Sequence, residues 1–237
     1  MNIVIVLAGG KGTRMMQDIP KQFIDLDGKP IVAHTLEKFN NCRAIDGIVV
    51  VCIESHKVTM KEICDKFYID KLINVISGGD TRHQSILCGL RHVEEKYGTL
   101  DDIKVLLHNA NMPLVTEENI NSCINDCKDL SDITTSVAKC TGYFYNIEQD
   151  NSLGLGPDRN NIVSAKVPEA MYLKTALDLY ERDCFKEKQY ESYTAGMLGI
   201  ISGLKVIPVV CETTNMKVTT PDDFELVKTY FRNQKKG

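Results

Sequence analysis

The sequence lacks the long apolar runs of a membrane protein and the positive charge of a nucleic-acid-binding protein. No run approaches the roughly 20 apolar residues that a membrane-spanning helix needs. The 237 residues carry 28 Lys and Arg against 32 Asp and Glu, which gives a net charge of -4. This balance predicts no polyanion-binding surface, so any phosphate site must be local. We therefore expect neither a membrane nor a nucleic acid as a partner.

Cysteine spacings typical of zinc or redox sites are also missing. The nine cysteines are scattered, Cys123 and Cys127 form the only close pair, and no CxxC or Cys/His cluster occurs. The odd count and the lack of a signal peptide favour reduced thiols and a cytoplasmic location. We expect the cysteines to be small buried hydrophobic residues.

Internal repeats, low-complexity tracts and interdomain linkers are absent too, and apolar runs alternate with helical segments. Runs without polar alternation predict strands buried on both faces at 2–7, 48–53, 72–76, 103–107, 133–138 and 204–210. Helical spacing predicts helices at 31–39, 57–67, 82–97, 116–127, 170–180 and 220–231. This pattern indicates an α/β fold, a Rossmann-like, mostly parallel sheet with helices on both faces, in a single domain over residues 1–237.

Residues 139–166 break this alternation and indicate a protruding β-arm. Residues 141–147 are typical of an exposed strand, 150–158 of a turn-rich tip, and 162–166 of the returning strand. Unpaired apolar edges are liabilities that proteins usually cover. We therefore expect a homodimer formed through the arm, in which a partner's residues could also approach the neighbouring site.

Three glycines follow the first predicted strand, in the stretch LAGGKG that begins at Leu7. Neither the GK[ST] ending of a P-loop nor the GxGxxG pattern is present. Glycine lets backbone amides approach a ligand closely, and such amides form a concave anion site. Arg14 and Lys21 place mobile cations beside these amides. The loop therefore suits a nucleoside triphosphate, the alternative being a glycine turn with two solvated cations.

Four stretches, in order, resemble motifs of the cytidylyltransferases that act on methylerythritol phosphate and ribitol phosphate. They read LAGGKGTRM at 7–15 with PKQF at 20–23, GGDTRHQS at 78–85, HNANMP at 108–113 and NMKVTTPDD at 215–223. The resemblance covers nearly the whole chain. It implies a nucleotidyltransferase that moves CMP from CTP to a small phosphorylated alcohol and releases pyrophosphate. Such a reaction depends on positioning and charge stabilisation and needs no protein nucleophile.

The resemblance also implies roles for individual residues. Arg14 and Lys21 would hold the triphosphate and stabilise the transition state, and Lys217 would approach the α-phosphate and the acceptor from the other side. The nucleotide would be bound by Leu7, Ala8, Gly9, Gly10, Gly12, Gly79, Asp80, Arg82, Ser85, Asn109 and Ala110. Mg²⁺ is the expected cofactor, supplied mainly through CTP. His108 is expected to orient its loop rather than to titrate in catalysis.

Two positions of the third stretch depart from the family pattern. Asn109 stands where the family has an aspartate that binds Mg²⁺. An amide oxygen can still ligate this cation weakly, but it lacks the charge that holds one tightly. Met112 stands where the family has an arginine, so an apolar chain replaces a charged fork. On the acceptor side, Lys139 and Thr141 are the candidates to replace the family's arginine and threonine.

The nucleotide motifs are retained whereas the metal and acceptor motifs differ. We therefore favour an active enzyme whose acceptor is a polyol phosphate of the ribitol or glycerol type, used for surface polysaccharide precursors. The alternatives are a catalytically impaired CTP-binding homologue and the methylerythritol-phosphate enzyme of isoprenoid synthesis. The choice of CTP over UTP follows from the resemblance alone, and the acceptor is left open by the sequence.

Overall fold

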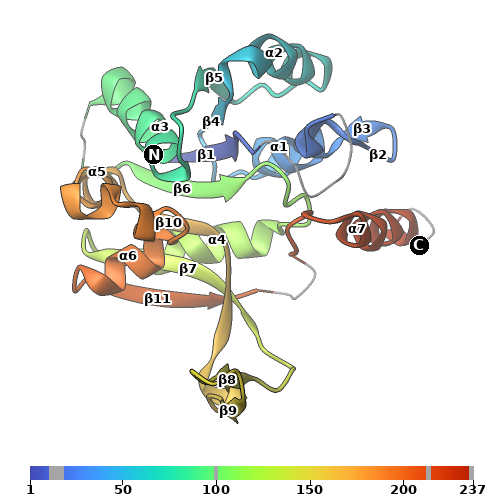
Figure 1. Ribbon diagram of the computed structural model, residues 1–237. Coiled ribbons are helices and arrows are strands. Elements are labelled where there is room, and N and C mark those ends of the chain that lie inside the picture. Colours follow the sequence, from blue (N-terminus) through green and yellow to red (C-terminus); the bar gives the residue numbers. More distant parts are fainter. Residues whose placement is uncertain (11–18, 99–100, 212–214, 235–237) are drawn as a thin grey trace.

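The computed structural model describes residues 1–10, 19–98, 101–211 and 215–234, and these are built around a seven-stranded sheet (Figure 1). The strand order is β11-β7-β10-β6-β1-β4-β5. The strands are β1 (Asn2–Ala8), β4 (Gly47–Cys52), β5 (Leu72–Ser77), β6 (Lys104–Asn109), β7 (Asp132–Lys139), β10 (Val163–Tyr172) and β11 (Lys205–Val210). Every pairing is parallel except those of β10, which runs antiparallel to β6 and β7. The expected α/β fold with a mostly parallel sheet is confirmed.

Helices cover both faces of this sheet (Figure 1). One face carries α1 (Ile31–Asn41), α2 (Lys57–Lys66) and α4 (Glu117–Asp126), and the other carries α3 (Arg82–Tyr97), α5 (Leu173–Tyr180) and α6 (Ala195–Ile201). In β1, Val4 and Val6 pack against the first set, whereas Ile3 and Ile5 pack against the second. All four side chains are fully buried. This two-sided burial is the reason why the strand sequences show no polar alternation.

The C-terminal helix α7 (Pro221–Gln234) lies apart from these two layers (Figure 1). Its Val227 belongs to a third apolar cluster, together with Leu26, Ile31 and Val218. Leu26 is part of a short hairpin formed by β2 (Asp25–Leu26) and β3 (Lys29–Pro30). The cluster therefore fixes the chain segment that precedes α7, which carries Lys217, against the N-terminal half of the molecule.

The sequence interpretation was wrong in two places between residues 163 and 201. Residues 170–172, expected in a helix, complete β10, and α5 begins only at Leu173. Ala170 and Met171 pair with both β6 and β7, and this pairing prevails over their helical spacing. The helix α6 was not expected at all. Its Ala-Gly-Met-Leu-Gly-Ile-Ile sequence contains two glycines, which disfavour a helix in isolation.

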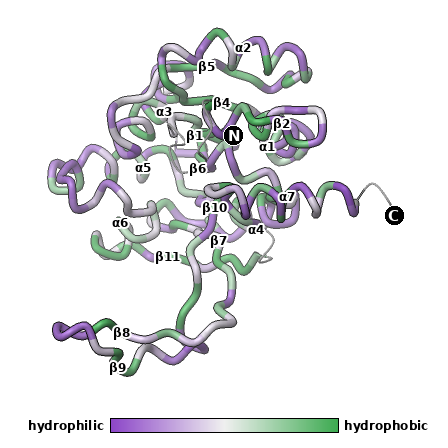
Figure 2. Tube along the Cα trace, turned by 45° about the vertical axis from the view of Figure 1, so that its right-hand side comes forward, coloured by the Kyte–Doolittle hydropathy of each residue, from purple (hydrophilic) through white to green (hydrophobic). Residues whose placement is uncertain are grey.

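The arm projects from the end of the sheet where β7 and β10 leave it (Figures 1 and 2). Its strands β8 (Tyr145–Ile147) and β9 (Leu153–Leu155) form an antiparallel ribbon. The turn therefore lies at 148–152, and β9 occupies part of the expected tip at 150–158. The ribbon exposes large apolar side chains, with Leu155 93% and Ile147 77% exposed.

The nine cysteines are all free thiols. Five are buried as expected, namely Cys42, Cys52, Cys64, Cys123 and Cys127, but Cys184 is exposed. Burial raises the pKa of the Cys64 and Cys123 thiols to about 12, so both stay protonated at neutral pH. In the described part of the chain, every helix is too short or too polar to cross a bilayer.

Candidate active site

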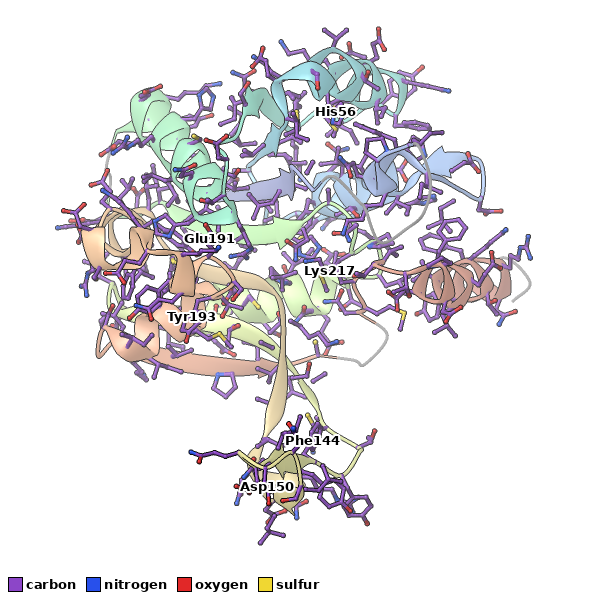
Figure 3. All side chains as sticks on the ribbon, in the orientation of Figure 1. His56, Phe144, Asp150, Glu191, Tyr193 and Lys217 are labelled. Carbon is purple, nitrogen blue, oxygen red and sulfur yellow. The ribbon has the colours of Figure 1, made fainter. Side chains whose placement is uncertain are left out.

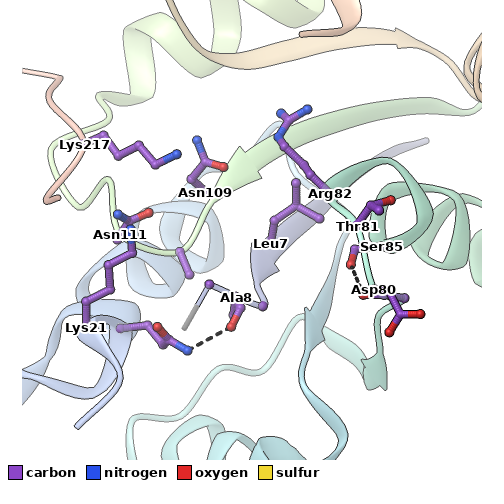
Figure 4. A pocket seen from close by; sticks show the side chains of 15 residues that line it. Leu7, Ala8, Lys21, Asp80, Thr81, Arg82, Ser85, Asn109, Asn111 and Lys217 are labelled. Carbon is purple, nitrogen blue, oxygen red and sulfur yellow. Dashed lines mark hydrogen bonds between the residues drawn. The ribbon is translucent and has the colours of Figure 1, made fainter. Parts of the chain in front are cut away.

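Three loops that follow parallel strands meet at the carboxyl edge of the sheet. β1 is flanked by β4 on one side and by β6 on the other, and β5 lies beyond β4. The direction in which successive strands are added to the sheet therefore reverses between β1 and β6. Sheets of this type bind ligands at such a reversal, beyond the strand ends. A cavity opens there (Figure 4). We call it the first cavity, and it is lined by Leu7, Ala8, Gly9, Gly10, Lys21, Gln22, Gly79, Asp80, Thr81, Arg82, Ser85, Asn109, Ala110, Asn111 and Lys217.

This lining contains every proposed nucleotide or catalytic residue that the structure describes. Arg14 and Gly12 lie outside the described residues, so their assigned roles stay predictions. Figure 4 shows Lys21, Asn111 and Lys217 on one side of the cavity and Asp80, Arg82 and Ser85 on the other. Residues more than 200 positions apart in sequence thus face one space, as the shared strand edge predicts.

The glycine loop is anchored by two hydrogen bonds at its base. The side-chain amide of Gln22 donates to the Ala8 carbonyl over 2.9 Å, and the backbone amide of Ala110 donates to the Leu7 carbonyl over 3.0 Å. Gln22 is buried in the middle of the 3₁₀ turn Lys21–Phe23, and its neighbour Lys21 lines the cavity. Sequence reasoning missed Gln22, although it lies inside the PKQF stretch.

The second loop ends in a capped helix that points its N-terminus at the cavity. Thr81 caps α3 by accepting from the Gln84 amide over 3.1 Å, while the Gln84 side chain accepts from the Asp80 amide over 2.8 Å. The Ser85 hydroxyl donates to the Gly79 carbonyl over 3.2 Å. A helix N-terminus carries partial positive charge and free amides, which favour a bound anion.

The third loop is held in shape by a buried histidine near the end of β6. His108 Nε2 lies 3.2 Å from the Met112 carbonyl, and its ring packs edge-on against Phe39. Burial lowers the pKa of His108 to about 4, so the ring is neutral at physiological pH. The expectation that His108 orients the loop agrees with this geometry. The neighbouring Asn109 donates from Nδ2 to Met112 Sδ over 3.5 Å.

Two asparagines hold the segment that carries Lys217. The Asn111 side chain donates to the Val218 carbonyl, and the Val218 amide donates back to the Asn111 carbonyl over 2.9 Å. The Asn215 side chain donates to the Val167 carbonyl over 2.7 Å. The backbone is therefore held by hydrogen bonds both before Lys217, at Asn215, and after it, at Val218. Neither asparagine was singled out from the sequence, because each partner lies at least 48 positions away.

A second cavity, of about 410 Å³, adjoins the first. Arg82, Asn109 and Lys217 line both cavities. The remaining lining of the second cavity consists of Met112, Ala165, Lys166, Val167, Ser192 and Thr194. Lys139 and Thr141, which the sequence suggested for the acceptor side, are exposed and are not among the described residues that line this cavity. Among its polar lining residues are Lys166, Ser192 and Thr194.

Comparison with known proteins identifies the family of the chain. The family model for IspD, 2-C-methyl-D-erythritol 4-phosphate cytidylyltransferase, matches residues 2–233. The chain belongs to this family. A ribitol-5-phosphate cytidylyltransferase of Streptococcus agalactiae serotype Ia is 35% identical over 233 residues, which cover 98% of this chain and 95% of that protein. One from Vibrio parahaemolyticus is also 35% identical, over 99% of this chain and 97% of that protein.

The methylerythritol branch of the family matches as well. A 2-C-methyl-D-erythritol 4-phosphate cytidylyltransferase of Lachnospira eligens is 28% identical over 98% of this chain and all of that protein. The crystal structure of 4-diphosphocytidyl-2C-methyl-D-erythritol synthase from Anaerococcus prevotii superposes with a TM-score of 0.81, at 24% identity and over 98% and 96% of the two chains. The chain is thus a cytidylyltransferase, and the fold is that of the family.

The site of this cytidylyltransferase offers few ligands for a protein-bound metal. Among the described residues, no group of three His, Cys, Asp or Glu side chains could hold an ion. Asn109 presents one neutral amide oxygen where both cavities meet. These residues fit Mg²⁺ only as a weak additional ligand to an ion whose other ligands come from a triphosphate and water.

Proposed function

We propose that this cytidylyltransferase transfers CMP from CTP to a small polyol phosphate of the ribitol type and releases pyrophosphate. The observation that carries this proposal is the pair of adjoining cavities with a common border of Arg82, Asn109 and Lys217. One cavity has the glycine loop and helix N-terminus that suit a triphosphate. The other has a lysine and two hydroxyl side chains that suit a phosphate on a hydroxylated body. Relatives that are 35% identical are named ribitol-5-phosphate cytidylyltransferases.

The proposed reaction is an in-line displacement at the α-phosphorus of CTP. An oxygen of the acceptor phosphate forms the new bond, and the bond between the α-phosphorus and the bridging oxygen to the β-phosphate breaks. The electron pair leaves with pyrophosphate, and the product is CDP joined to the polyol. Lys217, at the border of the cavities, neutralises charge near the α-phosphate, and Lys21 acts from the opposite loop.

Positioning supplies the rest of the proposed catalysis. Backbone atoms of Leu7 to Gly10 and the capped start of α3 hold the nucleotide, and Lys166 with Ser192 and Thr194 holds the acceptor. Fixing both reactants side by side removes the entropy cost of their encounter. When bound, Mg²⁺ adds charge neutralisation on the phosphates, and Asn109 is the residue that would contact it. Cytoplasmic CTP would serve as the donor, and the CDP-linked product would serve as a precursor of surface polysaccharides.

A homodimer formed through the β-arm is part of the same proposal. The ribbon exposes Tyr143, Tyr145, Ile147, Leu153 and Leu155, each at 64% or more. Figure 3 shows Phe144 and Asp150 on this arm, away from Lys217 of the same chain. An isolated two-stranded ribbon is marginally stable in water, so a second copy would cover its apolar side chains.

The test is pyrophosphate release from CTP with ribitol 5-phosphate, glycerol 3-phosphate, methylerythritol 4-phosphate, phosphocholine and aminoethylphosphonate. We expect the highest kcat/KM with ribitol 5-phosphate and no turnover with UTP. A preference for methylerythritol 4-phosphate would replace the proposed acceptor. CTP binding without turnover on any acceptor would support an impaired CTP-binding homologue, the reading favoured by Asn109 and Met112.

A further inference from the structure

Glu169 is a fully buried acidic side chain in the middle of β10. Its Oε1 accepts from the Gly196 amide over 2.9 Å and from the Thr135 hydroxyl over 3.1 Å. Its Oε2 accepts from the Ala195 amide over 3.1 Å. A buried carboxylate is costly unless its oxygens are bonded, and here three donors converge on it.

These bonds connect two walls of the second cavity. Lys166 and Val167 precede Glu169 on β10, where the pairing with β7 shifts between Ala165 and Glu169. Ser192 and Thr194 form another part of the lining, in the segment before α6, and the first two backbone amides of α6 donate to Glu169. Glu169 therefore fixes the distance between two parts of the lining, which we call the lysine wall (Lys166 and Val167) and the hydroxyl wall (Ser192 and Thr194).

One further contact holds the same loop. Arg82 Nη1 donates to the Tyr193 carbonyl over 3.2 Å, so the arginine on the cavity border also contacts the hydroxyl wall. Figure 3 shows Tyr193 and Glu191 on this loop, on the side of the sheet that carries α6. The start of α6 also lies close to the sheet, because a Cβ on Gly196 would lie 3.4 Å from Glu169 Oε1 and 3.3 Å from Val206 Cγ1.

Capping of α6 alone does not account for Glu169. Thr194 already caps this helix, since its hydroxyl accepts from the Met197 amide over 3.3 Å. Glu169 instead bonds the first two amides of the helix, directly next to Ser192 and Thr194. We propose that Glu169 is a positioning residue that sets the acceptor cavity for a phosphorylated polyol. This inference rests on the proposed function, in which the second cavity binds the acceptor.

The test compares steady-state kinetics of Glu169→Gln, Thr135→Val and Thr134→Val in the full chain. Thr135→Val removes one of the three donors to Glu169 and keeps the side-chain shape. Thr134→Val is the matched control, because Thr134 is also buried on β7 but donates to the Cys123 and Ala170 carbonyls instead. We expect Glu169→Gln to raise the KM for the acceptor about tenfold, Thr135→Val about threefold, and neither to change the KM for CTP more than about twofold.

The direction of the KM change separates geometry from charge. Removing the negative charge of Glu169 would make the cavity more positive, so charge alone predicts tighter binding of an acceptor phosphate. A fall in the acceptor KM, an equal rise in both KM values, or the same change in Thr134→Val would overturn the inference. If Glu169→Gln does not fold, Thr135→Val decides it in the same way.

A wild-type chain without turnover on any acceptor would defeat the proposed function separately. The positioning role is then decided by calorimetric binding of inorganic phosphate in the presence of CTP. Glu169→Gln is expected to weaken this binding about tenfold and Thr134→Val to leave it unchanged. Unchanged or absent phosphate binding would contradict the inference.

Discussion

At the scale of single residues, we propose that Asn109 contributes a weak ligand to Mg²⁺. The residue borders both cavities and has a neutral amide where the resemblance implies an aspartate. We predict that Asn109→Asp lowers the Mg²⁺ concentration needed for half-maximal activity about tenfold, because a charged oxygen holds the ion more tightly. Titration of activity against Mg²⁺ measures this, with the exposed Asn41→Asp as control. An unchanged Mg²⁺ profile would contradict the assignment of Asn109.

His108 gives the fold a dependence on pH. Burial lowers its pKa to about 4 in the folded chain, whereas the unfolded value is near 6.5. Between these two pH values the unfolded state binds more protons than the folded state. The contribution of His108 to the stability of the folded chain is therefore complete above pH 6.5 and is lost as the pH falls towards 4. The loss is on the order of 3 kcal/mol, and His34, whose pKa burial also lowers, acts in the same direction.

Urea unfolding between pH 4 and 7 checks this prediction. The variant His108→Gln keeps a donor for the Met112 carbonyl but cannot titrate. We expect its free energy of unfolding to change less with pH than that of the wild-type chain. Equal pH slopes for the two proteins would show that His108 is not the group responsible.

The residues of the site were predictable from the sequence only where local motifs carried them. Lys21, Asp80 and Ser85 lie in stretches that resemble the family's nucleotide motifs, and all three line the first cavity. Asn111 lies in the HNANMP stretch but was not singled out, and Glu169 lies in none of the four stretches. Their contacts join chain segments 107 and 26 or more positions apart, and only the folded sheet brings them together.

At the scale of elements, the loop between β5 and α3 places strict limits on side-chain size. A Cβ on Gly79 would lie 2.5 Å from Gln84 Cβ, inside the capping box of α3. We predict that Gly79→Ala displaces Gln84 and weakens CTP binding about tenfold. Isothermal titration with CTP measures the effect, and Gly142→Ala, where a Cβ meets nothing within 4 Å, is the control. Equal CTP affinities in the two variants would refute a role for this loop.

Elements with strong local signals were predicted well, and those that depend on pairing were not. The helix expected at 82–97 is α3 with the same bounds, because its apolar stripe and its polar start are local features. β10 could not be recognised in full, because Ala170 to Tyr172 become a strand only through pairing with β6 and β7. Such tertiary pairing overrides helical propensity.

At the scale of the whole molecule, the β-arm is the proposed dimer interface. We predict that the double substitution Ile147→Lys and Leu155→Lys converts a dimer into a folded monomer, because both side chains are more than three-quarters exposed in the single chain. Sedimentation velocity measures the change, with Val58→Lys on α2, where the side chain is 69% exposed, as control. A monomeric wild-type chain, or a double variant that remains dimeric, would exclude this interface.

The most direct test of the whole account is ³¹P NMR of the reaction of CTP with ribitol 5-phosphate. The account predicts equal amounts of pyrophosphate and a CDP-linked polyol with the wild-type chain. Lys217→Ala should lower kcat/KM by about 10²–10³-fold, as expected for a donor aimed at transition-state charge, while the exposed Lys61→Ala should leave it unchanged. Pyrophosphate without a CDP-linked product, or full activity in Lys217→Ala, would contradict the central claim that the two cavities join a nucleotide to an acceptor across Lys217.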